Sequence, residues 1–174
     1  MKAVFFDRDG TLIVDPPDLR VDSVKEIELF PDTLEALTEL AKLDYGVFIV
    51  SNQAGIGEGR FTREEYDAIQ KQVIERLRPS GIKILASYVC PHRPDDNCVC
   101  RKPKPFMLLQ SAKEFDIDLA SSFMIGDRQS DILAGQAAGT KTILVQTANT
   151  PVTSPDADYT APNLLAAVRY IATY

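Results

Sequence analysis

Short apolar segments alternate along the chain with longer segments in which apolar residues recur every three or four positions. The short segments are rich in β-branched and aromatic residues and contain no polar alternation, which is typical of strands buried on both faces of a parallel sheet. They cover residues 3–6, 46–50, 84–89, 122–125 and 142–145. The pattern therefore predicts five buried strands.

The intervening segments have helical spacing. Asp32 and Thr62 are each followed three residues later by Glu, which is the sequence signature of a capping box at a helix start. Pro79 marks the end of the second helix. The helices are predicted over residues 34–41, 62–77, 105–115, 131–138 and 162–171.

Alternating strands and helices predict right-handed crossovers and an α/β fold, a doubly wound, Rossmann-like parallel sheet in a single domain over residues 1–174. In such sheets the ligand site lies at the carboxyl ends of the strands. Asp7, Ser51, Cys90 and Asp127 each lie at the end of a different predicted strand. We therefore expect these side chains to meet at one edge of the sheet.

The first polar motif is Asp7-Arg8-Asp9-Gly10-Thr11. A carboxylate at a strand end can attack phosphorus, and a second carboxylate two residues later can protonate the leaving oxygen. The alternative is a simple turn after a strand. A calcium-binding loop is disfavoured because no glutamate follows at the required spacing.

A second motif, Ser51-Asn52-Gln53, places a hydroxyl and an amide where they can hydrogen-bond a phosphoryl oxygen. A plain junction between a strand and a loop has the same composition. In the third motif, Arg101-Lys102-Pro103-Lys104-Pro105, Lys102 can supply a point charge and Arg101 a forked donor. The alternative there is a basic surface loop.

The fourth motif, Gly126-Asp127-Arg128-Gln129-Ser130-Asp131, has one aspartate after a predicted strand and one at the start of a predicted helix. Asp127 follows a strand and is a natural Mg²⁺ ligand. Asp131 either orients neighbouring side chains or caps the helix, and the sequence leaves both open.

The four motifs, in this order, resemble the haloacid dehalogenase (HAD) superfamily of phosphatases. The resemblance implies that Asp7 is a nucleophile and Asp9 an acid/base partner. It implies that Mg²⁺ is held by Asp7, the main-chain carbonyl of Asp9 and Asp127, and that Ser51 and Lys102 stabilise the phosphoryl group. The candidate substrate-binding residues are Thr11, Asn52, Arg101 and Arg128.

All three cysteines and the single histidine lie between positions 90 and 100. Three thiolates and an imidazole form a closed tetrahedral Zn²⁺ site, which is a structural rather than a catalytic arrangement. Free thiols and a disulfide are the alternatives. We predict structural zinc that holds the segment carrying Arg101 and Lys102, with the ligands Cys90, His92, Cys98 and Cys100.

This loop also resembles two subfamilies of HAD phosphatases. One removes the 7-phosphate of D-glycero-D-manno-heptose 1,7-bisphosphate, and the other hydrolyses histidinol phosphate. The short loop at 93–97 and the residues at 16–22 resemble the histidinol subfamily. Residues 51–61, 106–109 and 134–139 resemble the heptose subfamily, which we favour.

The bulk properties narrow the class of partner. A net charge of −6 disfavours a general nucleic-acid binder, including a nucleic-acid 3′-phosphatase. We expect a cytoplasmic monomer that acts on a small phosphorylated metabolite and has no membrane partner. The remote alternative is a non-catalytic, zinc-stabilised binding module.

The stretch from Thr11 to Phe30 is too short for a cap domain. We therefore expect a capless enzyme whose specificity comes from loops at 15–21 and 55–60.

Overall fold

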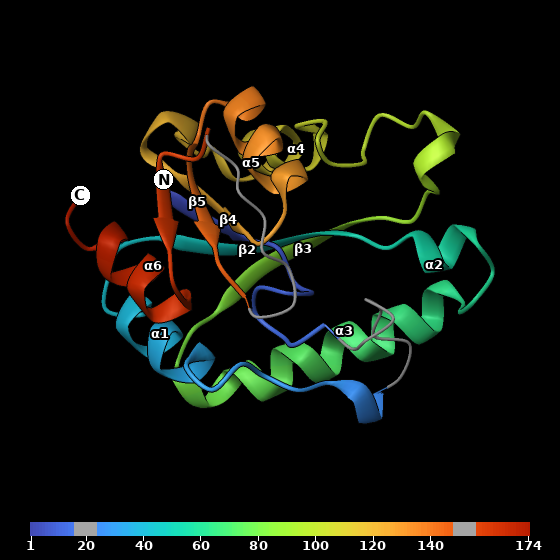
Figure 1. Ribbon diagram of the computed structural model, residues 1–174, viewed down its shortest axis with the longest axis horizontal. Helices are drawn as coiled ribbons and strands as arrows, with labels where there is room; N and C mark the ends of the chain where they lie inside the picture. The colour runs from blue at the N-terminus through green and yellow to red at the C-terminus, as the bar shows by residue number, and fades with distance from the viewer. Residues whose placement is uncertain (16–23, 148–155) are drawn as a thin grey trace.

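The computed structural model describes residues 1–15, 24–147 and 156–174, with a parallel sheet at its centre (Figure 1). Every pairing between the described strands is parallel. The strand order is β3-β2-β1-β4-β5-β6. The strands are β1 (Ala3–Phe6), β2 (Gly46–Asn52), β3 (Ile84–Cys90), β4 (Phe123–Gly126), β5 (Lys141–Val145) and β6 (Tyr159–Ala161). This order confirms the doubly wound fold.

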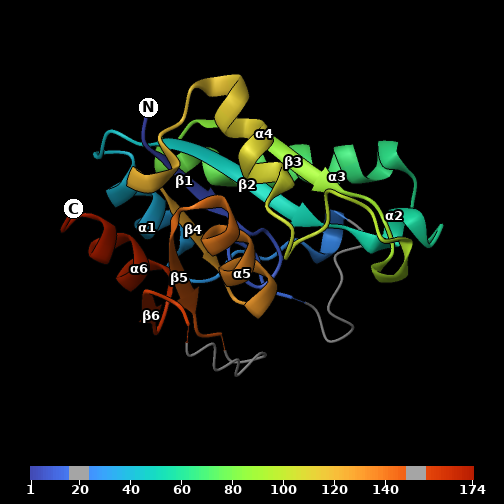
Figure 2. The same ribbon diagram turned by 90° about the horizontal axis from the view of Figure 1, so that it is seen from above.

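Helices cover both faces of the sheet, with α1, α3 and α6 on one face and α4 and α5 on the other (Figures 1 and 2). The helices are α1 (Thr33–Leu40), α2 (Ala54–Gly57), α3 (Arg63–Leu77), α4 (Phe106–Phe115), α5 (Gln129–Ala138) and α6 (Leu164–Ile171). Short 3₁₀ turns lie at Val24–Glu26, Arg78–Ser80, Pro94–Asp96 and Leu119–Ser121.

Strand β1 shows why the buried strands are apolar throughout. Successive side chains of a strand point to opposite faces of the sheet. Val4 and Phe6 pack into the core beneath α1, α3 and α6, whereas Ala3 and Phe5 pack into the core beneath α4. All four side chains are fully buried, so β1 is fixed between two apolar layers. Asp7, which follows β1, is therefore held at the edge of the sheet.

The predicted strands and helices are found within two residues of their expected ends, which is the usual uncertainty of element boundaries. Two elements were not predicted. The segment 147–161 was expected to be a loop, but its last residues form β6, whose Thr160 pairs with Leu144 of β5. The four-residue helix α2 lies where a loop was expected, and its Gly-containing sequence is too short to show helical spacing.

The two predicted capping boxes had different outcomes. At Thr62 the box is confirmed: the hydroxyl accepts from the Glu65 N–H at 3.1 Å, and the Glu65 carboxylate accepts from the Thr62 N–H at 2.6 Å. The prediction for Asp32 was wrong, because its side chain makes no cap bond to α1. The Asp32 carboxylate instead accepts from the Leu165 N–H, so it joins α1 to the first turn of α6 at 2.8 Å.

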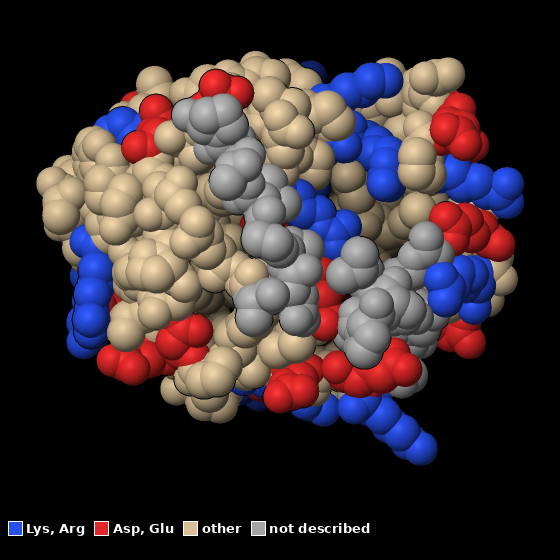
Figure 3. Space-filling view, in the orientation of Figure 1, with Lys and Arg blue, Asp and Glu red and all other residues tan. Residues whose placement is uncertain are grey.

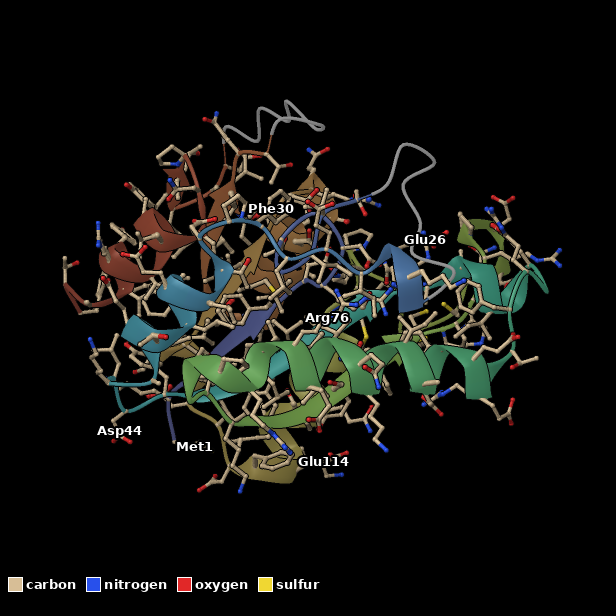
Figure 4. All side chains as sticks on the ribbon, turned by 90° about the horizontal axis from the view of Figure 1, so that it is seen from below. Met1, Glu26, Phe30, Asp44, Arg76 and Glu114 are labelled. Carbon is tan, nitrogen blue, oxygen red and sulfur yellow. The ribbon has the colours of Figure 1, made fainter. Side chains whose placement is uncertain are left out.

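The segment that follows the first motif is held against α3. Arg76 of α3 donates to the carbonyl of Ile27, and Figure 4 shows Arg76 between the helix and the segment that carries Glu26 and Phe30. Within the described parts of the chain, no helix has the length and apolar character needed to cross a membrane.

Candidate active site and cysteine–histidine loop

The carboxyl ends of β1, β2 and β4 meet at one edge of the sheet, as predicted. Asp7 directly follows β1, Ser51 lies in the last residues of β2, and Asp127 directly follows β4. A pocket of about 130 Å³ opens there, lined by Asp7, Asp9, Ser51, Asn52, Arg101, Lys102, Arg128, Ser130 and Asp131. Figure 3 shows several Lys and Arg side chains on the same face, over the loop after β3 and over α2.

Lys102 reaches this edge from the loop after β3 and is almost completely buried. Its Nζ lies 2.8 Å from Asp7 Oδ1 and 2.6 Å from Asp131 Oδ1, and it donates to the Val50 carbonyl at 2.8 Å. The three ammonium protons therefore have three acceptors. Burial alone would lower the pKa of Lys102, but Asp131 and Asp7 raise it above its usual value, so the side chain stays charged.

Asp7 lies among other acidic groups. Burial raises the pKa of Asp7 to about 8; Lys102 opposes this shift, and Asp131, Asp127 and Asp9 add to it. Oxygen atoms of Asp7, Asp127 and Asp131 lie within 4.8 Å of one another. A hard divalent cation would relieve the repulsion between these carboxylates, so the oxygen donors fit Mg²⁺.

The Asp9 carboxylate is held from behind by two side chains. Arg8 Nε donates to Oδ1 at 2.8 Å, and Arg8 Nη2 donates to Oδ2 at 2.9 Å. Gln53 Nε2 donates to Oδ2 at 2.5 Å and lies 2.7 Å from Ser51 Oγ. Asp9 keeps 12% of its side chain exposed, on the side of the pocket.

Thr11 and Asn52 have partners other than the predicted substrate. Thr11 is buried and does not line the pocket with Asp7; its hydroxyl donates to Asp127 Oδ1 at 3.3 Å. The Asn52 amide bonds the main chain of Lys102 on both sides, accepting from its N–H at 3.0 Å and donating to its carbonyl at 3.1 Å. Sequence could not show these partners, because both come from distant loops. These bonds position Asp127 and Lys102, and substrate contact by Thr11 and Asn52 stays a prediction.

Asp131 fulfils both of the roles that the sequence left open. Its Oδ2 accepts from the Arg128 N–H at 3.1 Å, which caps α5, while Oδ1 pairs with Lys102. Gly126 makes this possible, because a Cβ at that position would lie 2.4 Å from the Asp131 side chain. Gly10 has φ +83° and a Cβ there would lie 2.4 Å from Asp127, so only glycine lets the first motif turn against Asp127.

The two predicted arginines lie at the mouth of the pocket. Arg128 Nη2 donates to Asp15 at 2.7 Å and keeps 39% of its side chain exposed. Arg101 donates to the His92 carbonyl at 3.3 Å. Of the predicted specificity loops, residues 55–60 are described but 16–21 lie outside the described residues.

The four predicted zinc ligands converge in the loop after β3. Cys90 Sγ lies 3.5 Å from Cys98 Sγ and 2.8 Å from Cys100 Sγ, and His92 Nδ1 lies 3.2 Å from Cys100 Sγ. All three thiols are free, so the disulfide alternative was wrong. The four ligand atoms all lie within 4.8 Å of one another, and three thiols with an imidazole are a donor set that fits Zn²⁺. Zinc–sulfur bonds of about 2.3 Å would place sulfur ligands roughly 3.8 Å apart, farther than the Cys90–Cys100 distance.

Arg8 and Gln53 are site residues that the sequence did not single out. Both residues belong to motifs described above, but an arginine between two aspartates is typical of an exposed turn. In the structure Arg8 is fully buried. No pattern in the sequence indicated this burial, because it depends on the contact of Arg8 with Tyr66 and Gln70 of α3.

Comparison with known proteins identifies the family. A family model described as HAD-hydrolase-like matches residues 99–167. The D-glycero-beta-D-manno-heptose-1,7-bisphosphate 7-phosphatase of Helicobacter pylori strain J99 is 37% identical over 98% of this chain and 97% of its own length. The histidine biosynthesis bifunctional protein HisB of Campylobacter jejuni is 36% identical over 80% of this chain but only 40% of its own.

Comparison with solved structures finds the same kind of enzyme. The crystal structure of a D,D-heptose 1,7-bisphosphate phosphatase from B. bronchiseptica, complexed with magnesium and phosphate, matches with a TM-score of 0.89 at 32% identity, over 99% of both chains. Sequence and fold thus agree over nearly the whole length. The chain belongs to the HAD-like hydrolases.

Proposed function

We propose that this chain, as a single HAD-like domain, is a magnesium-dependent phosphomonoester hydrolase with Asp7 as its nucleophile. The observation that carries the proposal is the pairing of a buried Asp7 with a buried Lys102 at 2.8 Å, in a pocket whose lining also includes Asp9 and Ser51. A carboxylate at a strand end next to a fixed cation can approach phosphorus, while the cation meets the charge on the phosphoryl group.

The reaction has two steps. Asp7 forms a bond to phosphorus as the bond to the leaving oxygen breaks, and Asp9 gives that oxygen a proton. Water then attacks the aspartyl-phosphate, Asp9 takes its proton, and phosphate leaves Asp7. Ser51 and Lys102 hold the phosphoryl oxygens throughout. Mg²⁺, held by Asp7, Asp127 and the main-chain carbonyl of Asp9, would supply further positive charge for those oxygens.

The substrate that the site supports best is D-glycero-D-manno-heptose 1,7-bisphosphate, with loss of the 7-phosphate. Arg101 and Arg128 line the same pocket as Asp7, so they can bind the second phosphate while the first reacts. Histidinol phosphate, the alternative, carries an amine at its far end and would gain less from two arginines. The names of the heptose relatives point in the same direction.

We also propose that Cys90, His92, Cys98 and Cys100 hold structural zinc. Four protein ligands leave no open position for a substrate. Residues 101 and 102 follow the last ligand directly, so an ordered loop fixes the start of the segment that carries Lys102. We expect elemental analysis to find one zinc per chain. We also expect the protein to act as a monomer.

The substrate test compares kcat/KM on heptose 1,7-bisphosphate and on histidinol phosphate in Mg²⁺, with Asp7→Asn as the inactive control. A higher value on the heptose supports the proposal, and a higher value on histidinol phosphate selects the alternative. Faster release from an oligonucleotide 3′-phosphate would select a nucleic-acid enzyme. Equal activity of wild type and Asp7→Asn would reject a nucleophilic Asp7.

Arg128→Met tests the second phosphate site. We expect a rise in KM of about 10- to 100-fold on the bisphosphate and little change on a sugar monophosphate, because only the bisphosphate has the second anion. Arg78→Met is the matched control, since its exposed guanidinium pairs with Glu75 away from the pocket. Equal KM changes on both substrates would contradict this use of Arg128.

A further inference from the structure

Arg8 is the largest fully buried side chain of the described residues, and the reaction proposed above assigns it no part. Burying a guanidinium is costly unless the charge is paired and hydrogen-bonded. Arg8 is paired with Asp9, and both of its bonds to the carboxylate are shorter than 3.0 Å. Since no atom of Arg8 is exposed to the pocket, it cannot contact a substrate.

The far side of the Arg8 guanidinium rests on helix α3. Its Cζ lies 5.3 Å from the centre of the Tyr66 ring, and Nη1 lies 3.5 Å from Gln70 Oε1. Gln70 in turn donates to Ser87 Oγ of β3 at 3.1 Å. The guanidinium is therefore fixed between a core helix and the first motif and has little freedom to turn.

Gln53 approaches Asp9 from a second direction. Its backbone N–H donates to the Cys90 carbonyl at 2.8 Å, which ties it to the end of β3. A carboxylate offers about four lone-pair positions. Arg8 and Gln53 together occupy both positions on Oδ2 and one on Oδ1. The position left by these donors is on Oδ1, so the carboxylate has one orientation in which it can exchange a proton.

We infer that Arg8 and Gln53 form a clamp that positions Asp9 for proton transfer to the leaving oxygen. Arg8 and Gln53 are positioning residues, and Asp9 is the group that touches the substrate. The inference rests on the proposed function, because it assumes that Asp9 is the acid/base partner. The consequence for the first step is specific: loosening the clamp slows transfer from leaving groups that need a proton and spares transfer from those that do not.

The test uses Arg8→Met with two substrates in Mg²⁺. An alkyl phosphate such as glycerol 2-phosphate leaves as a strong base and needs the proton, whereas 4-nitrophenyl phosphate leaves as a stable anion. We expect kcat/KM, which reports the transfer to Asp7 and not the later hydrolysis common to both substrates, to fall about 100-fold on the alkyl phosphate and no more than about fivefold on the aryl phosphate. Equal losses on both substrates would overturn the inference.

Arg63→Met is the matched control, because this exposed arginine of α3 also lies near the Tyr66 ring, at 5.8 Å, and pairs with Asp67. It should leave both rates unchanged. If Arg8→Met does not fold, as judged by its thermal transition, Gln53→Met replaces it under the same criteria, with an expected selective loss of about tenfold.

Asp9→Asn separates the possible failures. It should show the selective loss in full, and adding Arg8→Met to it should increase that selectivity no further. A wild-type protein without Mg²⁺-dependent activity would refute the proposed function itself. An active wild type with a selective loss in Asp9→Asn but none in Arg8→Met would refute only the clamp.

Discussion

The pocket edge and the loop at 90–100 hold their polar groups in different ways. At the pocket edge, Asp7, Lys102 and Asp131 are buried and bonded to one another across β1, α5 and the loop after β3. In the loop, most residues between Cys90 and Cys100 are exposed, and few apolar side chains hold it. The sheet therefore positions the first group, whereas the proposed zinc is what we expect to hold the second group in place.

This difference predicts that substitutions at the pocket edge act first on chemistry, and substitutions in the loop act first on stability. The loop is nevertheless attached to the site, since Arg93 donates to the Gly57 carbonyl at 2.8 Å and Gln53 to the Cys90 carbonyl.

Asp7→Asn should have the largest effect on activity. It removes the nucleophile, so we expect kcat to fall by roughly 10⁴-fold or more. The side chain keeps its shape and loses a repelled charge, so the thermal transition should stay near the wild-type value. Initial rates measure kcat and calorimetry measures the thermal transition on the same preparation. A variant that loses activity only because it unfolds would contradict the claim that the pocket edge acts first on chemistry.

Lys102→Met should affect both properties. We expect kcat to fall about 100- to 1000-fold, because a fixed charge on the phosphoryl group is lost. Unfolding free energy should fall by about 3–5 kcal/mol, because Asp7 and Asp131 are left buried without their partner. Lys104→Met, an exposed neighbour, is the control. Urea unfolding that shows no loss for Lys102→Met would contradict the buried pair.

Cys98→Ser should act through stability. Loss of a ligand weakens zinc binding, and we expect the Tm to fall by at least about 5 °C, with kcat reduced about tenfold as Lys102 loses its support. Val99→Ser, at an exposed position between two ligands, should change neither. A metal-free protein with the wild-type Tm would show that the loop needs no zinc.

Thr62→Ala should have the smallest effect. Its capping box is exposed at the start of α3, so we expect a loss of about 1 kcal/mol in the free energy of unfolding and no change in kcat. The variant calibrates how much activity is lost through stability alone. A marked fall in kcat would mean that α3 controls the site through more than Arg8.

The sequence predicted where the site lies but not how its side chains are held. Parallel strands fix where Asp7, Ser51 and Asp127 meet, so strand ends were enough to bring them together. The bonds of Thr11 to Asp127 and of Asn52 to Lys102 join segments distant in sequence, so the sequence could not show them.

The same limit explains the missed elements. Strand β6 has three residues and gains its stability from pairing with β5, and α2 is a single helical turn. Neither is long enough to show a period. Asp32 has the sequence pattern of a capping box, but its carboxylate accepts from an N–H of α6 and not of α1. This partner depends on how the two helices pack, which the local sequence does not show.

The most direct test is to detect phosphate on Asp7. Enzyme mixed with substrate and Mg²⁺ is quenched in acid within one turnover and reduced with borohydride, which converts an acyl phosphate into an alcohol. Peptide mass spectrometry should then find homoserine at position 7, and only when substrate was present. An active enzyme whose residue 7 remains aspartate, or whose reduced residue lies elsewhere, would contradict nucleophilic attack by Asp7.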